Sequence, residues 1–237
     1  MVRSWLLLPF CIAFLGPGLS SSAQAQRRFK LSNGSAQYSA ELTVAGCAED
    51  QCQGRGTVRL FSKQTKQLVQ TFTSADLNFF LDNANHTQPT VNVVQLYGEQ
   101  SPLIFADFNF DGTEDLAIRN GNNSSYGGPS YDVYVYASRP RKFVPSAELT
   151  ALATENLGMF QLDTKRKRII TFEKSGCCWH LTTEYAVVPG QGLVEAKTVE
   201  EDATGAGEQV VVTTKEKVQG RWRTTVRRFP IKEYYKD

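Results

Sequence analysis

The segment LIFADFNFDGTEDLAIR, residues 103–119, has two short apolar runs on either side of an acidic turn that contains glycine. The runs cover 103–105 and 116–118, and both are too short for a helix but long enough for a strand. Between them, side chains that carry oxygen recur at alternate positions. The segment therefore predicts a strand, a tight turn and a second strand.

The oxygen-bearing residues of this turn have the spacing of a calcium loop. Asp107, Asn109 and Asp111 occupy positions one, three and five, the carbonyl of Thr113 the seventh, and Asp115 the ninth. Calcium takes roughly six to eight oxygen ligands, and carboxylates this close would repel one another without a cation. The sequence therefore predicts that these five residues bind one calcium ion, which pins the turn and fixes the loop that follows.

Position twelve distinguishes this turn from an EF-hand. Ile118 stands where an EF-hand has a bidentate glutamate, and the flanking residues are strand-like. The turn instead resembles the strand–loop–strand calcium sites of FG-GAP-type modules, in which the ninth position replaces the twelfth. A turn rich in Asx residues and free of any ion is the alternative interpretation.

Apolar and polar residues alternate with period two along much of the remaining chain. The predicted strands are 38–44, 58–61, 68–72, 91–97, 131–137, 159–162, 168–172, 179–188, 209–215 and 222–229. Segments 77–81 and 148–156 have the apolar spacing of short helices. Short strands separated by Gly, Asn, Pro and Asp clusters predict an all-β, antiparallel single domain, either β-propeller-like or a sandwich or barrel.

The first 25 residues have the pattern of a signal peptide. Arg3 precedes an apolar run, 5–15, that is too short to span a bilayer. Ala23 and Ala25 supply the small residues of a cleavage site, which leaves 26–237 as the mature domain. Cys11 lies inside the apolar run without a lipidation-type site. We expect a periplasmic protein that is secreted through a cleaved signal peptide.

Four cysteines remain after cleavage: Cys47, Cys52, Cys177 and Cys178. Their even number predicts two disulfides in an oxidising compartment. Local pairing would staple one turn and join the two neighbours, whereas crosswise pairing would tie an early hairpin to a later sheet. Local pairing is slightly favoured.

The mature chain carries nearly balanced charge, with 25 basic and 24 acidic residues. No large field therefore directs it toward nucleic acid or anionic lipid, and no second apolar stretch approaches the length of a membrane span. The basic clusters 165–168 and 221–228 are interrupted by apolar residues at strand spacing, so we interpret them as solvated sheet faces and turns. Trp179 and Trp222 are expected in the core.

The loop that follows the second strand reads NGNNSSYGGPSY, residues 120–131. Tyrosine offers contact area at low entropy cost, and Ser and Asn offer adaptable hydrogen bonds, which suits a protein-contact loop. A plain connection whose glycines serve positive φ explains the composition equally well. The candidate contact residues are Tyr126, Gly127, Gly128, Pro129, Ser130 and Tyr131.

Five motifs occur in one order along the chain: YGEQSP at 97–102, DFNFDG at 107–112, DLA at 115–117, YGGPSY at 126–131 and SGCCWH at 175–180. Together they resemble a family of bacterial periplasmic proteins with a β-propeller-like fold. The characterised member of that family is an immunity protein that inhibits a lysozyme-like, peptidoglycan-cleaving effector of a type IV secretion system. The resemblance covers roughly 36–188, and it implies a calcium site at the acidic turn and a projecting loop at 126–131.

Three classes of function follow from these features. A non-enzymatic inhibitor of a peptidoglycan hydrolase would place the 126–131 loop in a cleft that contains two catalytic carboxylates. An enzyme is not expected, because the chain shows no nucleophile elbow and no metal-binding histidine pair, and Glu99, Glu173 and Glu184 are interpreted as solvated strand residues. The alternative is a structural or adhesive envelope protein with a calcium-stabilised β module.

Overall fold

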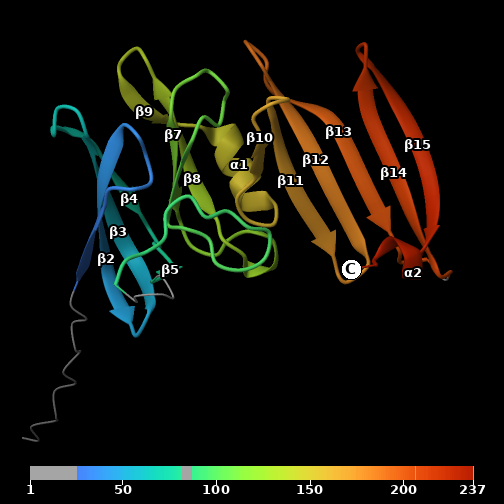
Figure 1. Cartoon of the computed structure of the whole chain (residues 1–237), viewed down its shortest axis with the longest axis horizontal. Helices are drawn as coiled ribbons and strands as arrows, with labels where there is room; N and C mark the ends of the chain where they lie inside the picture. Colours follow the sequence, from blue (N-terminus) through green and yellow to red (C-terminus); the bar gives the residue numbers. More distant parts are fainter. Residues whose placement is uncertain (1–25, 82–86, 206, 237) are drawn as a thin grey trace, which may run out of the picture.

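The computed structural model describes residues 26–81, 87–205 and 207–236, so the predicted signal peptide lies outside the described residues. Three antiparallel sheets follow one another along the chain and lie side by side (Figure 1). Within each sheet, strands that are adjacent in sequence are hydrogen-bonded neighbours, except that β5 in the first sheet does not pair with β4. The predicted all-β, antiparallel single domain is confirmed, but none of the sheets in the described part closes into a barrel, and they form no propeller ring.

The first sheet contains β1 (Arg27–Leu31), β2 (Tyr38–Ala48), β3 (Gln51–Ser62), β4 (Leu68–Ser74) and β5 (Phe79–Phe80), with β5 paired to β3. Residues 38, 40, 42 and 44 of β2 are buried, as the period-two pattern predicts. A disulfide between Cys47 and Cys52 closes the β2–β3 hairpin.

The second sheet lies between two hydrophobic cores. It contains β6 (Leu103–Ala106), β7 (Asp115–Arg119), β8 (Tyr131–Ala137) and β9 (Lys142–Pro145). All five residues of β7 are buried. Leu116 and Ile118 pack with the first sheet, whereas Ala117 packs on the other face with helix α1 (Ala147–Glu155). A central strand that is covered on both faces explains the uninterrupted apolar run in the sequence.

The third sheet becomes steadily more exposed along the chain. It contains β10 (Gln161–Asp163), β11 (Arg168–Ser175), β12 (Trp179–Val188), β13 (Gly192–Asp202), β14 (Gln209–Val218) and β15 (Arg221–Pro230), followed by α2 (Ile231–Tyr234). Of the residues described after Asp202, only Val210 is buried. Cys177 and Cys178 are disulfide-bonded in the β11–β12 turn, so local pairing of the cysteines is confirmed.

The predictions for two elements and for one single residue are wrong, whereas the predicted helix at 148–156 is confirmed. Segment 91–97 is a loop: Asn92 and Val93 make single backbone hydrogen bonds to residues 101–103, but the N–H of Phe105 binds the side-chain oxygen of Asn92 at 2.7 Å and the ladder does not continue. Segment 77–81 is not helical, since Phe79 and Phe80 pair with β3 as the short strand β5. Trp222 is 48% exposed rather than in the core. None of the described helices is long and apolar enough to cross a membrane.

Candidate metal turn and contact surface

The acidic turn between β6 and β7 directs its side-chain oxygens toward its own backbone. Asp107 accepts hydrogen bonds from the N–H groups of Asp111 at 3.0 Å and Gly112 at 2.9 Å. The side-chain oxygen of Asn109 accepts from the same Asp111 N–H at 3.0 Å. Because Asp107 and Asn109 meet at one N–H group, their oxygens face the concave side of the turn rather than bulk solvent.

Asp115 closes this turn from a fully buried position. One carboxylate oxygen accepts the N–H of Phe108 at 2.9 Å, and the other accepts the N–H of Tyr136 in β8 at 2.8 Å. Burial raises the pKa of Asp115 to about 6, although the two N–H donors act in the opposite direction. Each oxygen still has a lone pair available, so Asp115 links the turn to β8 without losing its capacity as a ligand.

The donor chemistry of the turn fits a hard cation such as calcium. Burial raises the pKa of Asp111, but hydrogen bonds from Thr113 and Asn109 outweigh it and lower the pKa below its usual value, which favours the carboxylate. Among the residues that the structure describes, no three His, Cys, Asp or Glu side chains gather into a metal cluster. The neutral oxygens of Asn109 and Thr113 would therefore have to complete the coordination. Calcium binding by the five predicted ligands stays a prediction.

The metal turn and the contact loop lie at opposite ends of β7. The strand begins at Asp115, where the turn ends, and it finishes at Arg119, where the loop begins. Five strand residues separate the two features by about 13 Å along the strand. A cation bound in the turn would therefore pin the end of the sheet that lies away from the loop, not the loop itself.

Arg119 organises the contact loop from a site that is only 6% exposed. Its Nε donates to the carbonyl of Gly121 at 2.9 Å, and an NH2 group donates to the side-chain oxygen of Asn122. The guanidinium also lies over the ring of Tyr131, 5.7 Å from the ring centroid. The loop is thus folded around a buried cation.

Only part of the predicted contact loop reaches the surface. Tyr126 is 65% exposed and Gly127 is also exposed, whereas Ser130 and Tyr131 are buried. The Tyr131 hydroxyl donates to the carbonyl of Ser101 at 2.8 Å. Ser130 and Tyr131 therefore support the loop from inside, and residues 126–129 remain as its contact portion.

Tyr126 meets residues from two other segments of the chain. Its hydroxyl accepts the N–H of Gly176, in the β11–β12 turn, at 2.7 Å. The Lys174 Nζ lies 4.7 Å from the ring centroid of Tyr126 and 5.0 Å from that of Tyr97, which is itself 61% exposed. We name Tyr97, Tyr126, Lys174 and the turn 175–178 the tyrosine–lysine surface.

Sequence reasoning did not identify Tyr97 or Lys174 as members of this surface. Both are distant from the contact loop in sequence, and neither carries a local signal of binding. The sequence motifs that resemble the periplasmic family gave the available indication, because Tyr97 and the turn 175–178 both lie within these motifs.

A small cavity of about 190 Å³ adjoins the contact loop and is lined in part by Glu99 and Arg119. The pKa of Glu99 is raised above its usual value by burial, although the charge of Arg119 acts in the opposite direction. Glu173 is not among the residues that line this cavity. Glu184 is ion-paired to Arg166 at 2.7 Å, on the third sheet. The three carboxylates considered for acid–base chemistry are therefore not assembled in this cavity.

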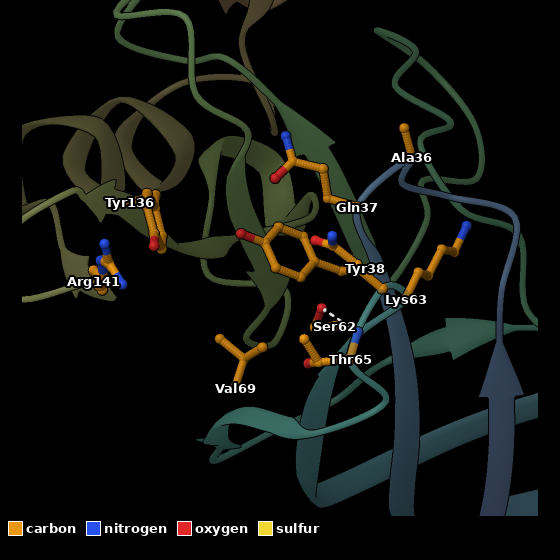
Figure 2. Close-up of a pocket in the computed structure, with 10 residues that line it drawn as sticks. Ala36, Gln37, Tyr38, Ser62, Lys63, Thr65, Val69, Tyr136 and Arg141 are labelled. Carbon is orange, nitrogen blue, oxygen red and sulfur yellow. Dashed lines mark hydrogen bonds between the residues drawn. The ribbon is translucent and has the colours of Figure 1, made fainter.

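A larger cavity of about 720 Å³ lies between the first two sheets (Figure 2). Tyr38 comes from β2 and Lys63 from the β3–β4 turn, whereas Tyr136 and Arg141 come from the β8–β9 region. The Tyr38 hydroxyl points toward Tyr136. The backbone N–H of Tyr136, one of the lining residues, donates to Asp115 of the metal turn. None of the predicted site residues lines it.

A scan against protein-family models and a search of curated proteins find no match for this sequence. Among solved structures, the chain is similar to one described as the structure of a Xanthomonas type IV secretion system related protein, with 19% sequence identity. The similarity covers 86% of this chain and 94% of that chain, with a TM-score of 0.61. This likeness shows that the two chains share a fold.

Proposed function

We propose that this protein is an exported inhibitor of a peptidoglycan-cleaving, lysozyme-like effector, and that it acts as an immunity protein. The observation that carries the proposal is the tyrosine–lysine surface. It presents two exposed aromatic rings with an ammonium group between them, next to a glycine-containing loop. The protein performs no catalysis in this proposal and works by steric occlusion of the effector's cleft.

The chemistry of the surface is complementary to that of a glycosidase cleft. Such clefts contain two carboxyl groups that act as acid and nucleophile or base. The ammonium of Lys174 offers a positive charge to these carboxylates, and tyrosine hydroxyls offer hydrogen-bond donors. Tyr97 and Tyr126 also provide broad contact area with few rotatable bonds.

The surface is organised before any partner arrives. The N–H of Gly176 fixes the hydroxyl of Tyr126, and Arg119 fixes the loop behind it through Gly121. Ordering of side chains and loops is one of the main costs of association, so a preformed surface loses less affinity to that cost.

Two further observations support the proposal. Both disulfides suit an oxidising compartment outside the cytoplasm, where peptidoglycan lies. The similar Xanthomonas structure is described as related to a type IV secretion system, which is consistent with a delivered effector as the partner. Calcium, when bound by Asp107, Asn109, Asp111, Thr113 and Asp115, would neutralise the carboxylates of the turn and stabilise the β6–β7 connection.

The proposal is tested by the charge reversal Lys174→Glu, with Tyr126→Ala as a second variant. We expect the wild-type protein to inhibit peptidoglycan clearing by a purified lysozyme-like effector of a type IV secretion system in a turbidity assay. Each variant should raise the dissociation constant by about tenfold or more, because the charge partner of a carboxylate or an aromatic anchor is lost.

The matched control is Lys66→Glu, which makes the same charge change at an exposed position in the turn between β3 and β4. It should inhibit as well as the wild-type protein. Unaltered inhibition by both surface variants, or equal weakening by the control, would contradict the proposal.

A further inference from the structure

The β14–β15 hairpin extends beyond the packed part of the molecule. Every residue from 215 to 228 is exposed, so both faces of the hairpin are open to solvent. The pairing of β13 with β14 ends at Lys197 and Glu216, and the last residues of β14 are paired only with β15. The hairpin stands at the end of the row of sheets in Figure 1.

The rest of the fold contributes little to the stability of this hairpin. Two-stranded hairpins are marginally stable alone in water, and long exposed edge strands are normally covered or kept short. Here β15 is a ten-residue edge strand, and none of its residues is buried. Its length and exposure point to a role in contact with something outside the chain.

The hairpin also concentrates the positive charge of the protein. Residues 209–230 contain six basic residues and one acidic residue, Glu216, which gives them a net charge of +5. The formal net charge of the whole chain is +2, so the remaining residues together carry −3. The near-neutral total therefore conceals a strongly basic projection on an acidic body, and this projection is attracted to anionic surfaces.

The tip of the hairpin combines apolar side chains with cations. Val218 is 46% exposed and Trp222 is 48% exposed, and they lie on either side of the turn. The cations that surround them are Lys215, Lys217, Arg221 and Arg223. Val218 pairs with Arg221 and Lys217 with Trp222, so alternate residues give each face of the tip one apolar group and neighbouring cations.

We propose that this hairpin tip docks on the surface of an anionic phospholipid bilayer. Tryptophan is enriched at membrane–water interfaces, and clustered Lys and Arg side chains are attracted to anionic headgroups. Val218 and Trp222 enter the headgroup region while the surrounding cations bind lipid phosphates. A nucleic acid is less well matched, because single-strand binding relies on aromatic stacking platforms and the tip offers one aromatic ring beside an aliphatic side chain. This inference stands independently of the inhibitor function.

The test is co-sedimentation of the protein, purified from the periplasm of an expressing bacterium, with lipid vesicles. We expect binding to phosphatidylcholine vesicles that contain roughly one quarter phosphatidylglycerol, little binding to pure phosphatidylcholine, and weaker binding as salt rises. Replacing Lys215, Lys217, Arg221 and Arg223 by Gln should lower the partition coefficient at least about 100-fold, since each cation near an anionic surface contributes about fivefold. Because these side chains are exposed, the variant should keep the wild-type circular dichroism spectrum.

Two controls make the test specific. Replacing Arg28, Lys30, Lys66 and Lys142 by Gln removes the same charge from exposed positions in β1, the β3–β4 turn and β9, and it should leave most of the binding intact. Trp222 fluorescence should shift to the blue on binding, and Trp222→Phe should abolish this shift because only Trp179 then remains in the mature chain. Failure to bind anionic vesicles, equal loss in the control variant, or binding to single-stranded DNA without binding to vesicles would overturn the proposal.

Discussion

The guanidinium of Arg119 is buried, and it donates hydrogen bonds to two groups of the contact loop. The carbonyl of Gly121 and the side chain of Asn122 both accept from it. Arg119→Met would keep the length of the side chain but remove both hydrogen bonds, so that the carbonyl of Gly121 would keep only the N–H of Ser130 at 3.1 Å. We expect the free energy of unfolding to fall by about 2 kcal/mol, measured by urea denaturation, and inhibition of the effector to weaken because the loop loses its internal support.

Arg59→Met is the control for this substitution. Arg59 pairs with Glu41 at 2.9 Å, but its side chain is 45% exposed, and exposed ion pairs contribute less than about 1 kcal/mol. An equal fall in stability in the two variants would show that the loss of any arginine, rather than the buried contacts of Arg119, causes the effect.

The burial of Tyr131 could not be predicted from the composition of the segment in which it lies. The sequence places this tyrosine in a stretch of Gly, Ser and Tyr typical of contact loops, yet the structure buries it under Arg119 at the start of β8. Lys174 was not identified because its own segment carries no signal of binding. Its position between Tyr97 and Tyr126 depends on how segments distant in the sequence pack together. Local sequence defines residue types, whereas exposure and neighbours depend on the tertiary structure.

At the scale of elements, the metal turn should respond to calcium without changing the contact loop. Calcium at about 100 times its dissociation constant should raise the free energy of unfolding by about 2.7 kcal/mol relative to EDTA, because the ion binds only the folded turn. Asp107→Asn combined with Asp111→Asn should abolish this increase in a thermal melt. Hydrogen exchange at residues 126–129 should be equal with calcium and with EDTA, since β7 separates the two features.

Asp163→Asn combined with Asp202→Asn provides the matched control for the calcium measurement. Both carboxylates accept a backbone N–H in a turn, from Arg166 at 2.9 Å and Thr204 at 2.8 Å, as the carboxylates of the metal turn do. This variant should keep its calcium response. A wild-type melt that is the same in calcium and EDTA would argue for an Asx-rich turn without an ion.

Strands could be predicted from sequence where residues alternate between a buried and an open face, and where a short apolar run adjoins a turn. The alternation in 38–44 matches the burial of β2, and the apolar runs beside the acidic turn match β6 and β7. Segment 91–97 has similar residues, but the side chains of Asn92 and Ser101 bind neighbouring backbone N–H groups, and the segment makes only isolated backbone hydrogen bonds to residues 101–103. Hydrophobic periodicity describes burial, and it does not specify which backbone will supply the hydrogen bonds.

At the scale of the whole molecule, the class of fold was predictable but the arrangement of its sheets was not. Turn residues between short strands indicate consecutive hairpins, and all three sheets are built mainly from such neighbours. Whether consecutive hairpins close into a barrel or stay as separate sheets depends on which faces are covered. Here Leu116 and Ala117 face different cores, so the second sheet is the middle layer of the molecule. The period-two pattern of a strand does not show whether its sheet is covered on one face or on both.

The order of strands in the third sheet places the two proposed surfaces at opposite ends of it. Trp179 pairs with Asp202 and Asp202 with Val211, so the turn 175–178 lies at the end where β14 begins. The tip at Val218 lies about 30 Å away, at the other end of ten-residue β14 (Figure 1). A protein docked by its hairpin tip would therefore direct the tyrosine–lysine surface away from the bilayer.

This geometry predicts that vesicle-bound protein inhibits the effector as well as free protein does. The turbidity assay should be repeated with saturating anionic vesicles and, as the control, with neutral vesicles that leave the protein in solution. Equal inhibition in both samples is expected, because neither partner covers the other's contact residues. A loss of inhibition confined to the anionic sample would mean that the bilayer covers the tyrosine–lysine surface, which a contact through Val218 and Trp222 alone cannot produce.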